Sequence, residues 1–391
     1  GLPHLSKRIR RLGLQFGLWV EPEMVNADSD LYRQHPEWAI RHPVSKPALG
    51  RRQLMLDLSN PAVIDHLDET LSSLFERAGV DYVKWDMNRN VSDLYSQYLS
   101  AADQGKLAHL YVLGLYRLLG RLKARFPSIL FESCASGGNR FDLGMHYYMP
   151  QAWTSDNTDA YERLHIQRGT ALAYPLSTIS NHINDDVAHQ TLRQVPLETR
   201  YNVAAFGVLG LELDTTGLSP FQKRLIRDQL NHYKTYRHLF QQGRLYDLSE
   251  ADADQRLLVV NETKALAALG LFQGLNKPNP PYQCVRLVGL DPDKIYRVTA
   301  RKQAANLRTF GNLIRHALPI RLKAHGTLFN ALSARYRFYE PEYSVVETGR
   351  HLMGKGLTLP YRFTGSGYHE ALRIMPDFGS KIYMIEEVKH G

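Results

Sequence analysis

Short apolar runs alternate with segments of helical periodicity over residues 1–241, and this alternation constrains the fold more than any other feature. The clearest helical segment follows Asn60-Pro61, carries apolar residues three or four positions apart, and stops at Gly79. Proline in the first turn and glycine just past the last turn are typical helix boundaries. Alternating strands and helices favour parallel β-α-β units, most simply an α/β fold of the (β/α)8 barrel type.

Six apolar runs are the predicted strands of this barrel, and five periodic segments are its predicted helices. The strands are expected at 14–20, 81–87, 128–136, 149–157, 176–183 and 208–214, and the helices at 4–12, 61–78, 107–126, 161–173 and 220–240. A complete barrel of this type has eight strands, and the helix at 4–12 should follow a strand. We therefore expect residues 1–241 to begin at about the third barrel strand, with the first two βα units upstream of Gly1.

From about residue 242 the pattern changes to short strand-like runs separated by turns. Examples are RLLVVN (256–261), LAALGLF (266–272) and KIYMIEEV (381–388). Such runs with little helical periodicity are typical of an antiparallel β-sandwich. The sequence thus predicts two domains, a barrel portion at 1–241 and a C-terminal β-sandwich at 242–391.

The charge pattern argues against a nucleic-acid or membrane partner. The net charge is +9, but the lysines and arginines are dispersed and form no long basic tract. The densest cluster, KRIRR at 7–11, fits the solvated face of a helix whose Ile9 and Leu12 face inward. No apolar run approaches the length of about 18 residues that a membrane helix requires.

Cysteine and histidine content excludes several kinds of site. Cys134 and Cys284 are the only cysteines, so a disulfide framework or a cysteine-based zinc site is not possible. The histidines form no HExxH pair and no nucleotide-binding glycine motif is present, so we expect neither a metal nor another cofactor. Few cysteines are compatible with a reducing compartment, and a cytoplasmic location is the expectation.

Two aspartates lie at the ends of predicted strands. Asp86 ends the apolar part of DYVKWDM (81–87), and Asp156 lies near the end of MPQAWTSDN (149–157). The carboxyl ends of barrel strands form the face on which active sites are built. A retaining glycosidase uses two carboxylates, one as nucleophile and one as acid/base. Because aspartate is common at strand ends, these two positions alone leave the chemistry open.

Other charged residues accompany this pair. Lys84 precedes Asp86 by two positions and therefore faces the same side of the strand. Its ammonium could stabilise the negative charge of Asp86 and donate to a sugar hydroxyl; the alternative is a buried structural ion pair of the two residues. For Glu21 and Glu23 a structural role is favoured, because the two strand-end carboxylates already fill the catalytic positions.

Several longer segments occur in an order that resembles a known family. They are GLWVEPEMVNADSDLYRQHPEW (17–38), RRQLMLDLSNP (51–61), YVKWDMNR (82–89), SCASGGNRFDLGMHYYMPQAWTSDNTDA (133–160) and RYNVAAFGVLGLELD (200–214). Together they resemble the catalytic domain of glycoside hydrolase family 36, the retaining α-galactosidases. The ending FTGSGYHEALRIMPDFGSKIYMI (363–385) is similar to the last strands of that family's C-terminal β domain.

The resemblance implies roles for individual residues. It implies that Asp86 is the nucleophile, which forms a covalent galactosyl-enzyme, and that Asp156 is the acid/base, with Asp159 in a supporting position. It also implies substrate-binding roles for one aromatic residue, two cationic residues and two residues of the turn SCASGG. These substrate-binding residues are Trp19, Arg51, Lys84, Cys134 and Gly137. Taken alone, Trp19 is also compatible with core packing, and Cys134 with an inert buried thiol.

The expected function follows from this resemblance. It implies an α-galactosidase that cleaves terminal non-reducing α-D-galactosyl residues of the melibiose or raffinose type with retention of configuration and without a cofactor. The expected partners are small α-galactoside oligosaccharides, and a homo-oligomer is expected because relatives often form tetramers. Two alternatives stay open. One is galactosyl transfer of the raffinose-synthase type, and the other is an inactive truncated fragment that needs a partner piece.

Overall fold

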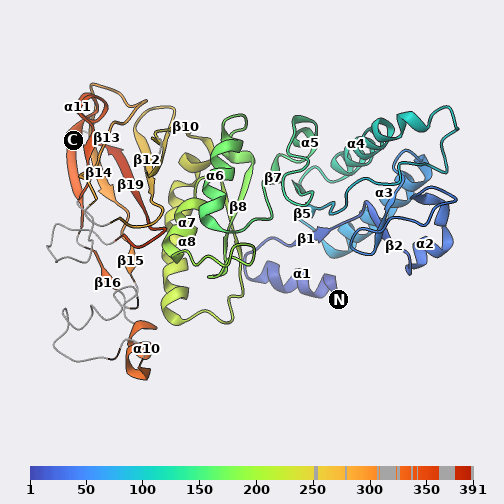
Figure 1. Ribbon diagram of the computed structural model, residues 1–391, viewed down its shortest axis with the longest axis horizontal. Helices are drawn as coiled ribbons and strands as arrows, with labels where there is room; N and C mark the ends of the chain where they lie inside the picture. The colour runs from blue at the N-terminus through green and yellow to red at the C-terminus, as the bar shows by residue number, and fades with distance from the viewer. Residues whose placement is uncertain are drawn as a thin grey trace. The chain divides into compact units, whose positions relative to one another are not determined.

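The computed structural model describes residues 1–250, 254–277, 280–305, 308, 323, 326–335, 338–340, 342–360 and 375–388. The chain forms two compact units, Gly1–Asp156 and Asn157–Gly391, which are described separately (Figure 1). Within the ending that resembles family 36, residues 363–374 lie outside the described residues. The domain boundary expected between residues 241 and 242 falls inside the second unit and stays a prediction.

A parallel sheet organises the first unit. Its strands, in spatial order, are β1 (Gly17–Val20), β5 (Tyr82–Trp85), β6 (Leu130–Ser133) and β7 (Gln151–Trp153). All adjacent pairs are parallel. The helices that join or flank them are α1 (Leu2–Arg11), α3 (Pro61–Ala78), α4 (Leu107–Arg125) and α5 (Leu143–Tyr148). This arrangement confirms the predicted parallel β-α-β units, although each strand is shorter than its apolar run.

Helix α3 shows how local sequence sets these boundaries. The side chain of Asn60 accepts the backbone N–H of Ala62, and Pro61 occupies the first turn. Gly79 ends the helix in the left-handed conformation with φ of 63°. The apolar stripe between these caps is buried together with that of α4, and the two helices lie side by side (Figure 1).

The residues between β1 and α3 form a second, smaller sheet. It contains β2 (Met24–Asn26), β4 (Gln53–Leu56) and β3 (Ala39–Ile40) in antiparallel order, with α2 (Asp30–Gln34) and the 3-10 turn η1 (Pro36–Trp38) nearby. A second 3-10 turn, η2 (Gln104–Lys106), precedes α4. The segments from β2 to β4 form a long excursion after β1 that brings the residues around Arg51 back toward the sheet edge.

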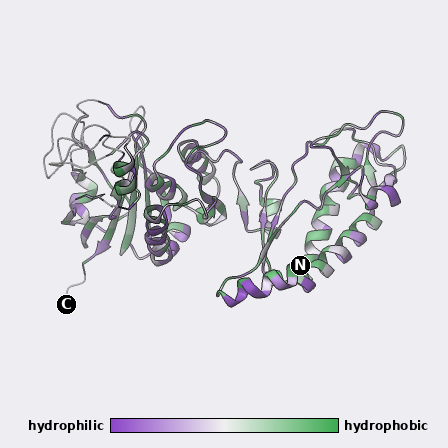
Figure 2. Ribbon diagram, turned by 90° about the horizontal axis from the view of Figure 1, so that it is seen from below, coloured by the Kyte–Doolittle hydropathy of each residue, from purple (hydrophilic) through white to green (hydrophobic). Residues whose placement is uncertain are grey.

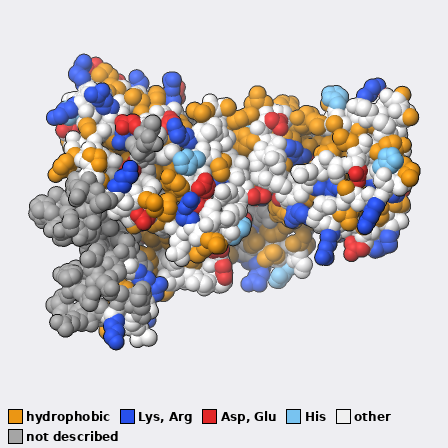
Figure 3. Space-filling model, viewed as in Figure 1, with side chains coloured by type: hydrophobic (Ala, Val, Ile, Leu, Met, Phe, Trp, Pro, Cys, Tyr) orange, Lys and Arg blue, Asp and Glu red, His pale blue; other side chains and the backbone are white. Residues whose placement is uncertain are grey.

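Helix α1 only partly matches its expected orientation. Ile9 packs against the core of the first unit as predicted, but Leu12 lies beyond the helix end and is exposed, so the prediction that Leu12 faces inward was wrong. The residue follows the last helical turn, where the periodicity no longer applies. Figure 2 shows α1 as largely hydrophilic, and Figure 3 shows lysine and arginine side chains scattered among neutral ones on the face that it draws.

The second unit begins with further β-α elements. Strands β8 (Ile179–Asn184) and β9 (Val208–Glu212) pair in parallel. Around them lie α6 (Ala160–Ala171), η3 (Leu176–Thr178), α7 (Leu197–Ala204) and α8 (Pro220–Gln242). Ser219 caps α8 in a capping box with Gln222, which confirms the predicted start of this helix.

An antiparallel sheet forms the rest of the second unit. Its order is β10 (Arg244–Asp247), β11 (Gln255–Val260), β12 (Leu266–Phe272), β19 (Ser380–Glu387), β14 (Ile295–Ala300) and β17 (Ser344–Thr348). Smaller elements are β13 (Cys284–Val285) with β18 (Leu357–Thr358), β15 (Ala304–Ala305) with β16 (Phe338–Tyr339), and helices α10 (Thr327–Ser333) and α11 (Gly349–Gly354). The large sheet shares one apolar core with β13 and β18, which confirms the predicted C-terminal antiparallel domain.

Among the described residues, no helix is both long and apolar enough to cross a membrane.

Candidate active site

The two candidate catalytic aspartates and the predicted substrate-binding residues belong to the first unit, whereas Asp159 belongs to the second. Most of the residues in the first unit lie at or just beyond one edge of its parallel sheet. Trp19 and Lys84 lie in β1 and β5, directly opposite each other in register. Asp86 follows β5, Cys134 follows β6, and Asp156 lies three residues after β7. Because parallel strands end at the same edge, the fold brings these side chains to one face of the sheet.

Asp86 is a buried carboxylate whose two oxygens both accept hydrogen bonds. Its side chain is only 6% exposed. Oδ2 accepts the indole N–H of Trp19 at 3.1 Å and the amide of Asn88 at 2.7 Å, and Oδ1 accepts the backbone N–H of Met87 at 2.9 Å. A buried charge requires such partners. These donors are neutral, and among the described residues no cation forms an ion pair with the carboxylate that is the candidate nucleophile.

Trp19 is well placed for a sugar platform. Its side chain is 52% exposed although it lies in a strand, and its ring N–H is fixed by the bond to Asp86. Core packing, the alternative that the sequence left open, is wrong for this tryptophan. An exposed aromatic face beside a buried carboxylate can cover the apolar face of a sugar ring.

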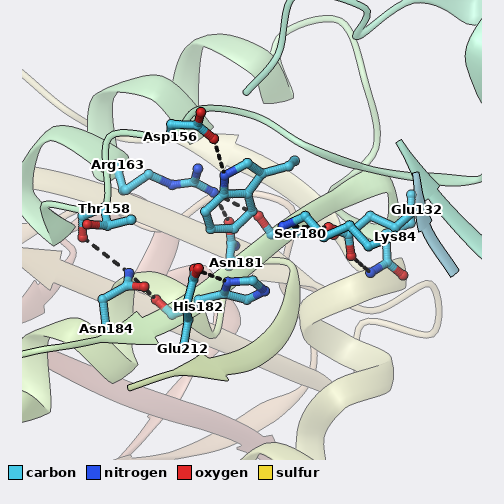
Figure 4. A network of polar contacts seen from close by, with 12 residues as sticks. Lys84, Glu132, Asp156, Thr158, Arg163, Ser180, Asn181, His182, Asn184 and Glu212 are labelled. Atoms are coloured by element: carbon cyan, nitrogen blue, oxygen red, sulfur yellow. Dashed lines mark hydrogen bonds and ion pairs between the residues drawn. The ribbon is translucent and has the colours of Figure 1, made fainter. Parts of the chain in front are cut away.

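Lys84 forms an ion pair with a residue that the sequence analysis did not select. Its Nζ lies 3.5 Å from Oε1 of Glu132 on the neighbouring strand (Figure 4). The ion pair of Lys84 is therefore with Glu132 and not with Asp86. The same ammonium lies 4.8 Å from the ring centroid of Trp153. The signal for Glu132 was present in the sequence as a lone carboxylate inside the apolar run SILFES, which a strand can bury only with a partner.

Arg51 reaches the site through Glu21. Its Nη1 donates to Oε1 of Glu21 at 2.8 Å, and the amide of Asn88 donates to the same oxygen. Asn88 therefore bridges Glu21 and Asp86. Glu21 thus has the structural role that was favoured for it, and the exposed guanidinium of Arg51 keeps further donors available.

Glu23 is the second glutamate with a structural role. It is fully buried and accepts the indole N–H of Trp85 at 2.7 Å and the hydroxyl of Tyr111 at 2.6 Å. Arg140 completes the cluster with an ion pair at 2.9 Å. Because Trp85 directly precedes Asp86, this cluster fixes the backbone from which the candidate nucleophile projects.

Cys134 directly follows β6, in the turn SCASGG (133–138). Its backbone carbonyl accepts the N–H of Met87 at 3.1 Å, which ties the turn to the residue after Asp86. Burial, and then the charge of Asp86, raises the pKa of the Cys134 thiol well above its usual range. The group therefore stays a neutral thiol, which agrees with a packing or contact role and not with a nucleophilic one.

The same turn packs against the segment that carries Asp156. A Cβ on Gly137 would lie 2.8 Å from the backbone nitrogen of Asp156 and 2.8 Å from Cα of Ser155. Gly137 also adopts φ of 84°, which favours glycine. The carboxyl of Asp156 accepts the indole N–H of Trp153 at 3.0 Å (Figure 4). The turn after β6 thus touches the residues that carry both candidate catalytic carboxylates.

Replacing Gly137 by alanine is expected to lower both stability and activity. A left-handed alanine costs about 1–2 kcal/mol, and the contact with Ser155 and Asp156 must open to admit the methyl group. The expected loss of unfolding free energy is roughly 2–4 kcal/mol, measured by urea denaturation, together with a fall in kcat/KM.

Gly120→Ala is the matched control for this change. Gly120 lies inside α4, and its added Cβ would meet only Cε1 of Tyr148, at 3.8 Å. Alanine is a better helix former than glycine by up to about 1 kcal/mol, so this variant should be at least as stable as the unchanged chain. Equal stability of the two variants would contradict the account of Gly137.

Asp159, which was given a supporting position beside Asp156, forms its contacts within the second unit. It caps α6 by accepting the backbone N–H of Tyr161 at 2.9 Å, and it also accepts the hydroxyl of Thr191 at 2.6 Å and the guanidinium of Arg193. Its side chain is buried. These contacts are those of a structural residue, in agreement with the supporting position assigned to it.

Among the described residues, no group of three or more histidine, cysteine, aspartate or glutamate side chains could hold a metal ion.

Comparison with known proteins identifies the family. Residues 1–243 match the melibiase family, and residues 255–385 match the glycosyl hydrolase family 36 C-terminal domain. The chain is 45% identical over 300 residues to an α-galactosidase of Geobacillus stearothermophilus, a match that covers 76% of this chain and 41% of the relative. The chain therefore spans about two fifths of the length of this curated relative.

Solved structures agree with the sequence match. The α-galactosidase of Lactobacillus brevis superimposes with a TM-score of 0.84 at 37% identity, over 100% of this chain and 47% of that one. A family 36 α-galactosidase of Geobacillus stearothermophilus in complex with raffinose gives a TM-score of 0.83 at 38% identity, over 99% and 47% of the two chains. The chain belongs to glycoside hydrolase family 36, the melibiase family.

Proposed function

We propose that this chain carries the catalytic carboxylates of a retaining α-galactosidase, which releases terminal α-D-galactosyl residues from oligosaccharides of the melibiose and raffinose type. The observation that carries the proposal is the environment of Asp86, a buried carboxylate held by neutral donors beside the exposed face of Trp19. The raffinose that a relative binds supports the substrate class.

Asp86 is the proposed nucleophile. It attacks the anomeric carbon of the galactosyl residue, and the bond from that carbon to the leaving oxygen breaks. Lys84 and Arg51 donate to sugar hydroxyls, while Trp19 covers the apolar face of the ring. The hydrogen bonds that Asp86 accepts from Trp19 and Asn88 orient the attacking oxygen before the substrate arrives.

Asp156 is the proposed acid/base. It gives its proton to the leaving oxygen in the first step. In the second step it takes a proton from water, whose oxygen bonds to the anomeric carbon while the bond from that carbon to Asp86 breaks and frees the Asp86 carboxylate. Each step inverts the anomeric carbon, so the product keeps the α configuration.

The distance between the two carboxylates depends on the strands that carry them. Strands β5 and β7 are separated by β6, so their backbones lie roughly 10 Å apart. A carboxylate separation of about 5–5.5 Å, which retention requires, then needs both side chains to converge over the turn that contains Cys134 and Gly137.

Hydrolysis of melibiose followed by proton NMR tests this function. The first-formed galactose should be the α anomer, which later equilibrates with the β anomer. Release of β-galactose first would contradict the assignment of Asp86 as nucleophile. Accumulation of larger galactosides at high acceptor concentration would favour transfer as the main reaction. Absence of any product from the unmodified chain would contradict the proposed function of the chain by itself.

Substitution of Trp19 tests the proposed sugar platform. Trp19→Ala should raise KM for an aryl α-galactoside by about 10-fold or more, because the apolar face of the sugar loses its cover. Trp19→Phe should restore most of the affinity but keep a lowered kcat, because phenylalanine lacks the N–H that holds Asp86. Steady-state kinetics of both variants separate the two effects, and equal KM values for the two would contradict the platform.

A homo-oligomeric assembly and a cytoplasmic location stay predictions for this chain.

A further inference from the structure

We propose that Glu132 is a positioning residue of this site, whose carboxylate holds the ammonium of Lys84 where that group meets the sugar. The inference rests on the proposed function, because it acts through the sugar contact proposed for Lys84. No role was predicted for Glu132 from the sequence. Its contacts lie on the face of the sheet that carries the site.

Register places Glu132 in the same row as the site residues. Across the four parallel strands, Trp19 is opposite Lys84, Lys84 is opposite Glu132, and Glu132 is opposite Gln151. Residues in register on neighbouring strands point to the same face of a sheet. Glu132 therefore belongs to the layer of side chains on which the proposed sugar site lies.

The two oxygens of Glu132 have different partners. Oε2 accepts the amide of Gln151 at 3.0 Å and the hydroxyl of Tyr82. Oε1 is buried and accepts no hydrogen bond from any residue that the structure describes, and Nζ of Lys84 faces it at 3.5 Å (Figure 4). The neutral donors orient the carboxylate from one side and leave the other oxygen for the ammonium.

The charge balance of the cluster supports this role. Glu132 is 3% exposed, and a buried carboxylate is costly without a cation nearby. Burial, and then the charge of Glu132, raises the pKa of Tyr82 far above its usual range, so the phenol stays protonated and donates. Lys84 is the cation that forms an ion pair with Glu132. At 3.5 Å this pair is loose enough for the ammonium to donate to a sugar hydroxyl as well.

The position of Lys84 also affects the acid/base side of the site. Its ammonium lies over the ring of Trp153, whose indole N–H donates to Asp156. A displaced Lys84 would therefore disturb the orientation of Asp156, through Trp153, as well as the sugar contact. A merely structural ion pair would contribute stability without this link to catalysis.

A double-mutant cycle distinguishes positioning from stability. Glu132→Gln alone should lower kcat/KM for an aryl α-galactoside about 10- to 100-fold, as loss of a charge-assisted contact does. In the Lys84→Met background the same change should alter kcat/KM by less than about 2-fold, because residues that act through each other are not additive. An equal loss in both backgrounds would overturn the inference.

A second variant covers the case in which Glu132→Gln does not fold. Tyr82→Phe keeps the ring but removes a donor that orients Glu132, so it should lower kcat/KM several-fold, again only when Lys84 is present. Asp57→Asn is the matched control, since Asp57 is a buried carboxylate of the same unit that is bonded to Ser59 and Ser96 and to no cation of the site. Its effect should be the same with and without Lys84.

Binding of galactose separates this inference from the proposed function. Titration calorimetry needs no turnover, and the cycle of Glu132 with Lys84 can be repeated on the dissociation constant. Binding without hydrolysis would contradict the proposed function while the cycle still decides the role of Glu132. If the unmodified, folded chain binds no galactose, the inference falls together with the proposed function.

Discussion

Replacing Asp86 by alanine is expected to abolish glycoside hydrolysis, with kcat lowered by roughly 10⁴- to 10⁶-fold. The reason is that no other carboxylate of the described first unit receives the set of contacts that orients Asp86 at the sheet edge. The Asp86 oxygens accept from Trp19, Asn88 and the backbone of Met87, and removal of the side chain leaves these donors around an empty space. The measurement is release of phenol from an aryl α-galactoside.

Azide tests whether the lost group is the nucleophile. In Asp86→Ala a small anion can enter from the side of the missing carboxylate and attack the anomeric carbon, which gives β-galactosyl azide by a single inversion. Asp65→Ala is the control, because Asp65 lies on α3 and pairs with Arg121 at the surface. This control should keep full activity. Retention of more than a small fraction of activity in folded Asp86→Ala protein would refute the assignment.

Replacing Asp156 by alanine is expected to give a loss that depends on the leaving group. For melibiose, whose leaving sugar needs a proton, kcat/KM should fall by about 10²- to 10⁴-fold. For an aryl galactoside with an acidic phenol the first step needs no acid, so the loss should be much smaller. Added azide should attack the galactosyl-enzyme on Asp86 and give α-galactosyl azide, the anomer opposite to that formed by Asp86→Ala.

Asp159→Asn is the matched control for the acid/base assignment. Asparagine can still cap α6, because its side-chain oxygen accepts the N–H of Tyr161. This variant should keep the leaving-group dependence of the unchanged chain. If Asp159→Asn and not Asp156→Ala produced the selective loss on melibiose, the two aspartates would have to exchange roles.

The order of strands and helices could be predicted because each element carries its own local signals. Asn60, Pro61 and Gly79 delimit α3 where expected, and Ser219 with Pro220 begins α8. Strand ends were less accurate, since an apolar run continues into the turns that follow it. The run at 149–157 contains a strand only at Gln151–Trp153, and the polar residues after Trp153 form the loop that carries Asp156.

The candidate site was predicted at the level of residue type and position, whereas its internal contacts were not. Lys84 was expected to act beside Asp86, and the structure pairs it with Glu132 on the next strand. Pairing across strands depends on register, which brings together residues that are far apart in the sequence. Likewise, Gly137 was selected because it lies in a turn that could approach a ligand. Its close packing against the backbone of Asp156 could not be predicted, because it depends on the tertiary structure.

The sequence by itself determined the class of fold, the family resemblance and the two strand-end aspartates, because periodicity, caps and motif order are local properties of the chain. Only the tertiary structure decided which donors hold Asp86, which carboxylate holds Lys84, and that the turn from Cys134 to Gly138 lies against the residues that carry both aspartates. These contacts join β1, β5, β6 and β7, and their geometry is set by strand register and packing.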